Sequence, residues 1–177
     1  MEPKVIEKGQ IILVGFSFYG DPFAEYGGWT AGNEIGRLGE RFMDYFLKHG
    51  ERIKHIKRLG AAFEVHVETD ETATKGYREV FMGVEVEHLE DVPVEMLIKI
   101  LPPATYVVVT IQGEQIASDW SQLLGEWMEE AGYESAYNYG MQYYDERFKG
   151  VDKLDASEID VYVPIKKVEG DSSDGDK

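Results

Sequence analysis

The chain has 177 residues, a formal net charge of −16 and no cysteine. This length can bury a core of its own, so we expect one domain over residues 1–167. The lack of cysteine excludes disulfides, thiolate metal sites and cysteine nucleophiles. The acidic balance argues against direct nucleic-acid binding, which needs a basic footprint. It favours either simple solubility or a preference for cationic ligands and basic partners.

The N-terminal residues lack the apolar core of a secretory signal, and no apolar run approaches the ~20 residues of a membrane span. We therefore expect a cytoplasmic protein that makes no membrane contact. Residues 168–177 are acidic and of low complexity, which predicts a disordered tail.

The first half of the chain predicts a strand, a helix and two further strands. β-branched and aromatic residues predict a strand over 10–19. Asn33 is a good N-cap for a helix that runs to about residue 49 with an apolar stripe at the 3.6-residue period. Alternating apolar residues then predict strands over 59–67 and 77–87.

The second half repeats this order. A valine-rich strand is expected over 105–112, an amphipathic helix over 116–133, and strands over 137–144 and 157–165. The pattern predicts an α+β fold of duplicated βαββ units, with pseudo-repeats over 5–88 and 102–167. We expect antiparallel sheets related by a pseudo-two-fold axis, with both helices on one side.

Aromatic residues are abundant, with 11 tyrosines, 8 phenylalanines and 3 tryptophans. Several fall opposite the valines of their strands, which predicts an aromatic groove on the sheet face that the helices leave uncovered. A second small core or a dimer interface would explain the same pattern. Spacing favours a core position for Trp127, whereas Trp120 begins the helix near the strand ends, and Trp29 lies in a glycine-rich loop that could form a lid.

No motif indicates a cofactor or a catalytic centre. The four histidines lack a ligand spacing such as HxxxH, and there is no GxSxG, P-loop or dinucleotide fingerprint. We therefore expect no cofactor and no catalytic residue, and the spacing gives no support for a metal site.

Three stretches together resemble the GyrI-like effector-binding domains. The stretches are the helix W…L…EWM…GY from Trp120 to Tyr133, the strand YREVFMGVEVE from Tyr77 to Glu87, and the closing strand IDVYVPI from Ile159 to Ile165 with YDERF (144–148) before it. Such domains form the ligand-binding half of AraC-type and MerR-type multidrug regulators and also occur alone, as in integron-associated effector-binding proteins. The resemblance implies a duplicated βαββ fold with a central ligand cleft between the halves, which binds amphipathic, often cationic, aromatic compounds. The chain has no helix-turn-helix segment, so we expect a stand-alone binder.

The family often places a buried glutamate two residues before a strand tyrosine, where it pairs with a cationic ligand. Here that position is Gln142, which supplies no charge. Either Glu85 or Glu64 takes this role, or the ligand is neutral. Some relatives hydrolyse reactive electrophiles with a glutamate and a tyrosine, and others inhibit DNA gyrase. We therefore keep a hydrolase and a protein-interaction module as alternatives to a binding protein.

The expected ligand is an amphipathic small molecule, bound by stacking aromatics, a hydrogen-bonding glutamine and a carboxylate. The candidate binding residues are Phe81, Glu85, Trp120, Gln142, Tyr144 and Tyr162.

Overall fold

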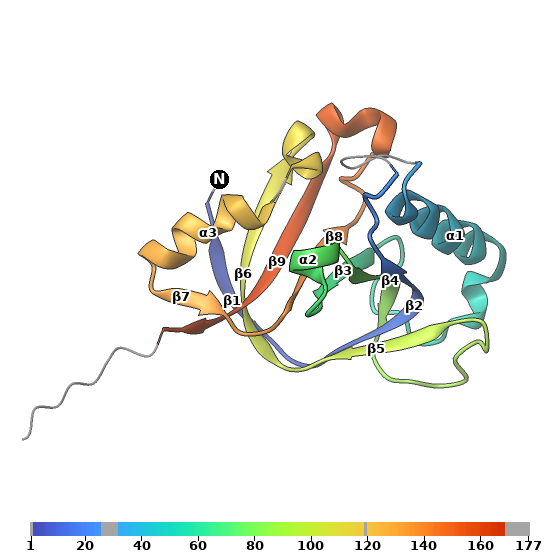
Figure 1. Ribbon diagram of the computed structural model, residues 1–177. Coiled ribbons are helices and arrows are strands. Elements are labelled where there is room, and N and C mark those ends of the chain that lie inside the picture. Colours follow the sequence, from blue (N-terminus) through green and yellow to red (C-terminus); the bar gives the residue numbers. More distant parts are fainter. Residues whose placement is uncertain (1, 26–31, 119, 169–177) are drawn as a thin grey trace, which may run out of the picture.

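Figure 1 shows the computed structural model of the chain, which describes residues 2–25, 32–118 and 120–168. Trp29 and nearly all of the predicted acidic tail lie outside the described residues.

The elements follow the predicted order, with additions. The first half contains β1 (Lys4–Lys8), β2 (Ile11–Gly20), α1 (Glu34–His49), η1 (Gly50–Arg52), β3 (Ala62–Glu68), α2 (Thr72–Lys75) and β4 (Arg78–Val86). The second half contains β5 (Leu97–Leu101), β6 (Ala104–Gln112), η2 (Gly113–Ala117), α3 (Trp120–Glu130), β7 (Tyr133–Ser135), β8 (Tyr139–Tyr144), η3 (Val151–Ala156) and β9 (Glu158–Lys167).

All strands join one antiparallel sheet in the order β1-β6-β9-β8-β3-β4-β2-β5, with β7 paired to β9. The units β2-α1-β3-β4 and β6-α3-β8-β9 meet at the central pair β3 and β8, and each places its strands in the same order outward from that pair. The predicted α+β fold of duplicated βαββ units is therefore confirmed.

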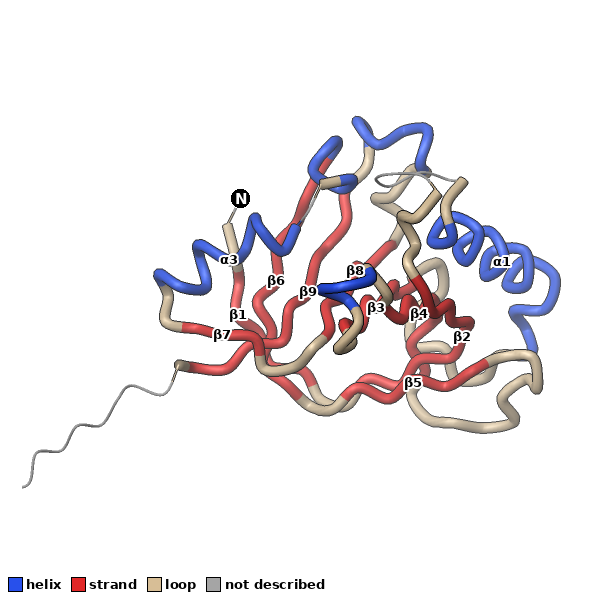
Figure 2. The backbone as a smooth tube through the Cα atoms, viewed as in Figure 1, coloured by secondary structure: helices blue, strands red, loops and turns tan. Residues whose placement is uncertain are grey.

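The edge strands were not predicted, and they are exchanged between the halves. β1 precedes β2 in the chain but pairs with β6, whereas β5 precedes β6 but pairs with β2. The two edges are paired in the same way. Lys8, the last residue of β1, pairs with Ala104, the first residue of β6, and Leu101, the last residue of β5, pairs with Ile11, the first residue of β2. Only residues 9–10 and 102–103 connect these distant positions in the sheet order, so the sheet must curve until its two ends approach each other (Figure 2).

The curved sheet is packed on both faces. Helix α1 covers β2 and β4 on one side of the helix-bearing face, and α3 covers β6 and β9 on the other (Figure 1). The opposite face is filled by a third cluster that draws on both halves and includes Phe81, Tyr106 and Met141. The central strands β3 and β8 lie between the two helices.

Helix α1 forms as its sequence predicts. The Asn33 side chain accepts a hydrogen bond of 3.0 Å from the backbone N–H of Gly36, which satisfies a free donor at the helix start. Ile35, Leu38 and Phe42 form the buried stripe.

The second helix is shorter than predicted. Residues 113–117 form a separate 3-10 turn, and α3 begins only at Trp120. Ser118 breaks the helix because its backbone is extended (φ −89°, ψ 169°) and its hydroxyl donates to the carbonyl of Gln115 at 2.6 Å. Ile116, on the predicted helical stripe, is buried from the 3-10 turn.

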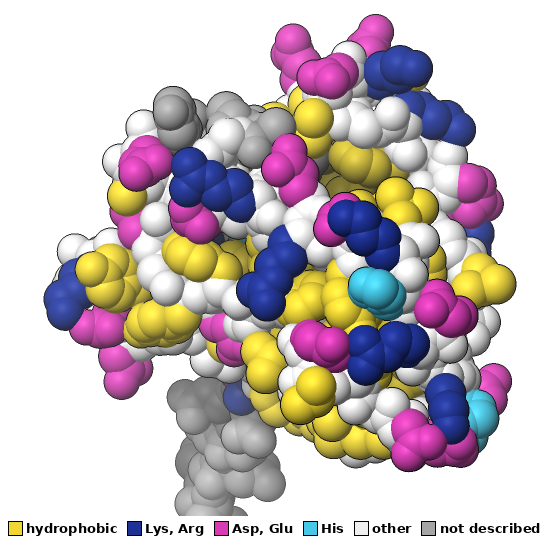
Figure 3. All heavy atoms as spheres, turned by 90° about the vertical axis from the view of Figure 1, so that its right-hand side faces the viewer, with side chains coloured by type: hydrophobic (Ala, Val, Ile, Leu, Met, Phe, Trp, Pro, Cys, Tyr) yellow, Lys and Arg dark blue, Asp and Glu magenta, His cyan; other side chains and the backbone are white. Residues whose placement is uncertain are grey.

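On the side of the molecule that carries α1 and β5, acidic and basic side chains are mixed around apolar areas (Figure 3). Strand β5 exposes Leu97, Ile98 and Ile100. Within the described residues, no helix has the length and apolar character needed to cross a membrane.

Candidate functional site

A cleft of about 1270 Å³ lies between the two halves on the helix-bearing face. One wall comes from η2, α3, β7 and the segment that follows β7. The other comes from the ends of β3 and β4 together with Phe23 and Ile35, and β8 contributes Gly140 and Gln142 to the floor. A cleft of this size between related halves has room for a drug-sized ligand.

A buried polar cluster lies at the floor. Glu64 of β3 faces Gln142 of β8 directly across the central strand pair. The Glu64 carboxylate is 1% exposed and accepts from the Tyr144 hydroxyl at 3.2 Å, and its other oxygen lies 2.6 Å from Nε2 of His66. The Tyr144 hydroxyl also lies 2.6 Å from Oε1 of Gln142. His66 and Gln142 line the cleft, and Glu64 lies directly behind them, beneath the cleft floor.

The protonation of Tyr144 is fixed by its surroundings. Burial, and then the adjacent Glu64 carboxylate, raise the pKa of Tyr144 well above its usual value. The hydroxyl therefore stays a donor across the neutral range. It has one proton and two acceptor oxygens within reach, so the cluster has spare acceptor capacity.

Glu64 has no strong cation of its own. Among the described residues, its one ion-pair partner is His66, which carries a charge only when protonated. A neutral imidazole that donates from Nε2 leaves the carboxylate charge in place and keeps Nδ1 as an acceptor. An isolated carboxylate in a low-dielectric site is costly unless a cation approaches it.

The charged groups at the cleft wall are Glu68, Glu129 and Arg78. With Glu64 beneath the floor, three carboxylates oppose one guanidinium among the described residues. The Arg78 guanidinium lies over the Phe23 ring, 5.8 Å from its centroid, and its buried Nε atom has no hydrogen-bond partner among the described residues. The cleft therefore favours positive charge overall while offering one unused donor.

Aromatic rings form much of the remaining wall. Tyr137 lines the cleft and stacks on Tyr139 with centroids 5.7 Å apart, while Tyr139 itself packs in the third cluster, where its hydroxyl lies 2.8 Å from that of Tyr106. Tyr133 also lines the cleft, and its ring stacks on that of Trp127 with the centroids 5.9 Å apart. The faces of aromatic rings attract organic cations.

The structure brings together Gln142 and Tyr144 from the predicted set, and places three other members on the opposite face. Phe81 and Tyr162 pack within the third cluster, away from the cleft. The pairing of β8 with β9 is the cause: Met141 faces Tyr162, and Gln142 faces Val161. Directly paired residues point to the same face of a sheet, so Gln142 and Tyr162 point to opposite faces.

Glu85 also lies on the opposite face, and its charge is already matched. Lys57 Nζ is 2.6 Å from Oε1 of Glu85, and the carboxylate side chain is 15% exposed. Trp120 is the first residue of α3 beside the cleft, but its side chain lies outside the described part of the chain.

Sequence reasoning named Glu64 only as an alternative carboxylate and did not select His66. The available signal was their position among apolar residues in the strand sequence AFEVHVE, whose residues 63–66 are all buried. A charged residue and a histidine sharing one face of such a strand indicate a functional cluster more strongly than exposed aromatics do.

The sequence profile of the integron-associated effector-binding proteins matches residues 4–165. The chain belongs to this family. The resemblance inferred from the motifs is thereby confirmed, and the family links the fold to effector binding.

Individual relatives fit this assignment. The chain is 29% identical over 168 residues to the transcriptional regulator BrlR of Pseudomonas aeruginosa, and the match covers 93% of this chain and 56% of that protein. The chain therefore spans about half the length of that regulator. Among solved structures, SAV2435 bound to tetraphenylphosphonium is similar with a TM-score of 0.67 and 13% identity, over 94% of both chains. An integron cassette protein of Vibrio cholerae is similar with a TM-score of 0.58 and 15% identity, over 93% of this chain and 95% of that one.

Proposed function

We propose that this chain is a small-molecule effector-binding protein whose cleft takes an amphipathic aromatic cation. The observation that carries the proposal is the buried carboxylate of Glu64, which lies at the cleft floor without a lysine or arginine partner among the described residues. A ligand cation would supply the missing counter-charge. His66, Gln142 and Tyr144 would hold the carboxylate in place.

The cleft wall supports the same ligand class. Tyr133 and Tyr137 offer ring faces, and the exposed Glu68 and Glu129 add negative charge at the wall. The unused Nε–H of Arg78 suits a hydrogen-bond acceptor on the ligand. SAV2435, which shares the fold, is a structure with a lipophilic aromatic cation bound.

By analogy with the regulator BrlR, ligand binding would feed into transcription regulation through a protein partner. The protein would act as a drug-sensing accessory. Its net charge of −16 makes a direct contact with DNA phosphates unfavourable, so the partner would make that contact.

The direct test is calorimetric titration of tetraphenylphosphonium into the protein and into a variant with a narrowed cleft. Gly125 of α3 lines the cleft, and a Cβ at this position would meet no atom within 4 Å. Gly125→Leu should therefore project a side chain into the cleft and narrow it, and leucine favours the helix over glycine. We expect saturable 1:1 binding to the natural chain and at least tenfold weaker binding to Gly125→Leu, with its thermal stability kept or raised.

Gly9→Leu is the matched control, because a Cβ there also meets nothing within 4 Å and the residue lies outside the cleft. Its affinity should equal that of the natural chain. Absence of saturable binding to the natural chain, or equal binding by both leucine variants, would overturn the proposal.

The contact between Glu64 and His66 supports a second candidate, a hydrolase acting on a reactive small electrophile. A carboxylate 2.6 Å from Nε2 of a cleft-lining histidine can orient the imidazole so that Nδ1 acts as a general base toward water. The test is hydrolysis of an activated ester or epoxide by the natural chain and by His66→Gln. Turnover that is lost in His66→Gln but kept in His49→Gln would favour the enzyme, and equal rates in all three would exclude it.

A further inference from the structure

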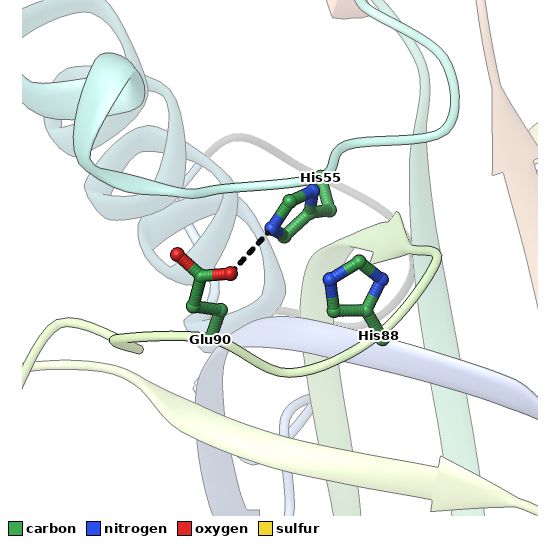
Figure 4. A group of neighbouring side chains, drawn as sticks. All are labelled: His55, His88 and Glu90. Carbon is green, nitrogen blue, oxygen red and sulfur yellow. Dashed lines mark hydrogen bonds and ion pairs between the residues drawn. The ribbon is translucent and has the colours of Figure 1, made fainter.

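Outside the cleft, His55, His88 and Glu90 gather at the surface of the first half. One ligand atom from each lies within 4.8 Å of the others. His55 belongs to the loop between η1 and β3, and the other two follow β4. Figure 4 shows the two imidazole rings side by side, with the Glu90 carboxylate directed at His55; the ring centroids are 3.8 Å apart.

Backbone contacts fix the two loops against each other. Ile56 forms a β-bridge with Val86, and the N–H of Glu87 donates to the carbonyl of His55 at 2.9 Å. The N–H of Lys57 donates to the carbonyl of Glu85 at the same distance. The position of His55 relative to His88 is therefore set by the fold.

Unusual backbone geometry is concentrated at the same place. Among the described residues, two non-glycine residues have positive φ: His55 at 59° and Asp91, which follows Glu90, at 45°. Such conformations persist where the surrounding structure holds them, and they are found preferentially at binding sites.

The Glu90 carboxylate has one oxygen bonded to a lysine and the other directed at His55. Lys54 Nζ donates to Oε1 at 2.8 Å and to Asp91 at 2.7 Å, while Oε2 of Glu90 lies 3.0 Å from Nε2 of His55. Lys54 therefore occupies one carboxylate oxygen and leaves the other directed at the histidines. This arrangement permits coordination through a single oxygen.

We propose that His55, His88 and Glu90 bind a divalent transition-metal ion of the Zn²⁺ or Co²⁺ class, with water completing the coordination. Metal–ligand bonds of ~2.0–2.1 Å place the corners of a tetrahedron about 3.3 Å apart. The separation of 3.0 Å between His55 and Glu90 is already close to that value. The remaining ligand atoms need to move by no more than about 1.5 Å, which rotation of exposed side chains supplies.

The ligand set distinguishes this ion from the hard cations. Two imidazoles and one carboxylate suit zinc, cobalt, nickel or copper, whereas Mg²⁺ and Ca²⁺ prefer all-oxygen sites. None of the three residues lines the cleft, so binding here is independent of the proposed effector site. A bound ion would clamp the loop before β3 to the loop after β4, which should stabilise the first half.

The test is calorimetric and thermal-shift titration with ZnCl₂ and CoCl₂ in a buffer without chelating groups and with magnesium in excess. Magnesium occupies the carboxylates of the acidic surface, so it suppresses unselective binding. We expect one saturable site, a raised unfolding temperature, and a visible Co²⁺ spectrum of low coordination number. Affinity should fall at least tenfold in His88→Ala and in Glu90→Gln.

His49→Ala is the matched control, since His49 is exposed at the end of α1 and outside the cluster. It should bind like the natural chain. Failure to saturate, or an unchanged affinity in both His88→Ala and Glu90→Gln, would overturn the proposal. The unfolding temperature of each variant without metal reports whether it is folded. His88→Ala and Glu90→Gln remove different ligands, so a loss of affinity in both does not depend on the folding of one variant alone.

Discussion

Replacing the Glu64 carboxylate by an amide should reduce cation binding without weakening the fold. Glutamine has the same shape as glutamate, and its carbonyl can still accept from the Tyr144 hydroxyl. The change also removes the cost of keeping a 1% exposed carboxylate away from water. The unfolding free energy of Glu64→Gln should therefore equal or exceed that of the natural chain in urea denaturation.

The loss of affinity follows from the position of the carboxylate. A cation in contact with His66 and Gln142 would lie about 6 Å from Glu64, and at an effective dielectric constant of ~20 their attraction is roughly 3 kcal/mol. That energy corresponds to a factor of about 100 in the dissociation constant. A higher effective dielectric constant would reduce the factor, so about tenfold is the smallest loss consistent with the reasoning.

Tetraphenylphosphonium and tetraphenylborate have the same shape and opposite charge, so calorimetry with both separates charge from fit. Glu64→Gln should weaken the cation and should leave the anion unchanged or improve it. Glu85→Gln is the control, because Glu85 lies on the opposite sheet face and is paired with Lys57. Equal changes for both ions, or a larger effect from Glu85→Gln, would refute the role given to Glu64.

Three further outcomes can be measured on the fold itself. Gly15→Ala should destabilise by about 1–3 kcal/mol in urea denaturation, because its Cβ would lie 1.9 Å from the Met82 carbonyl oxygen across the strand pair. Tyr144→Phe should cost about 1–3 kcal/mol, since it removes the donor to Glu64 and to a second acceptor, whereas Tyr162→Phe should be close to neutral. Burial, and then the nearby Asp160 carboxylate, raise the pKa of Tyr162 to about 12. Tyr162 therefore ionises first in the unfolded chain above pH 10, and its share of the stability should fall from there by up to about 1.4 kcal/mol per pH unit, with no contribution below pH 10. Tyr144, whose pKa is also raised, adds to the fall, so the difference between the natural chain and Tyr162→Phe in denaturation at alkaline pH isolates the Tyr162 share.

The elements with one buried face were the ones that sequence predicted well. Helix α1 has a single apolar stripe and a good N-cap, and both are found in the structure. In β1 (KVIEK) and β5 (LIKIL) the third and fifth residues are less exposed than their neighbours, but residue type does not follow this alternation. Lysines occupy two of the sheltered positions, and apolar residues occupy the exposed positions of β5. The pairing of both strands depends on the exchange between halves, which no local pattern encodes.

The site was harder to predict because the central strands are buried on both faces. The first four residues of β8 are all buried, so alternation does not reveal which of its side chains share a face with those of β9. The pairing of Met141 with Tyr162 shows which side chains of β8 and β9 share a face, and it places Tyr162 on the face opposite the cleft. The four-residue stretch from Glu64 to Val67 carried more information, because charge on a buried strand is costly and is kept for a reason.

The meeting of the two halves at Glu64 and Gln142 bears on how such clefts diverge. In the first half a glutamate precedes His66 by two residues, and in the second a glutamine precedes Tyr144 by two residues. The resemblance to the family places the acid in the second repeat, where this chain has Gln142. Comparison of that position alone would record a lost charge. In space the charge lies one strand spacing away, about 5 Å, on the other side of the pseudo-two-fold axis. A duplicated fold thus offers two positions from which the same point of the cleft can be charged, and in this chain the carboxylate stands at the first of them.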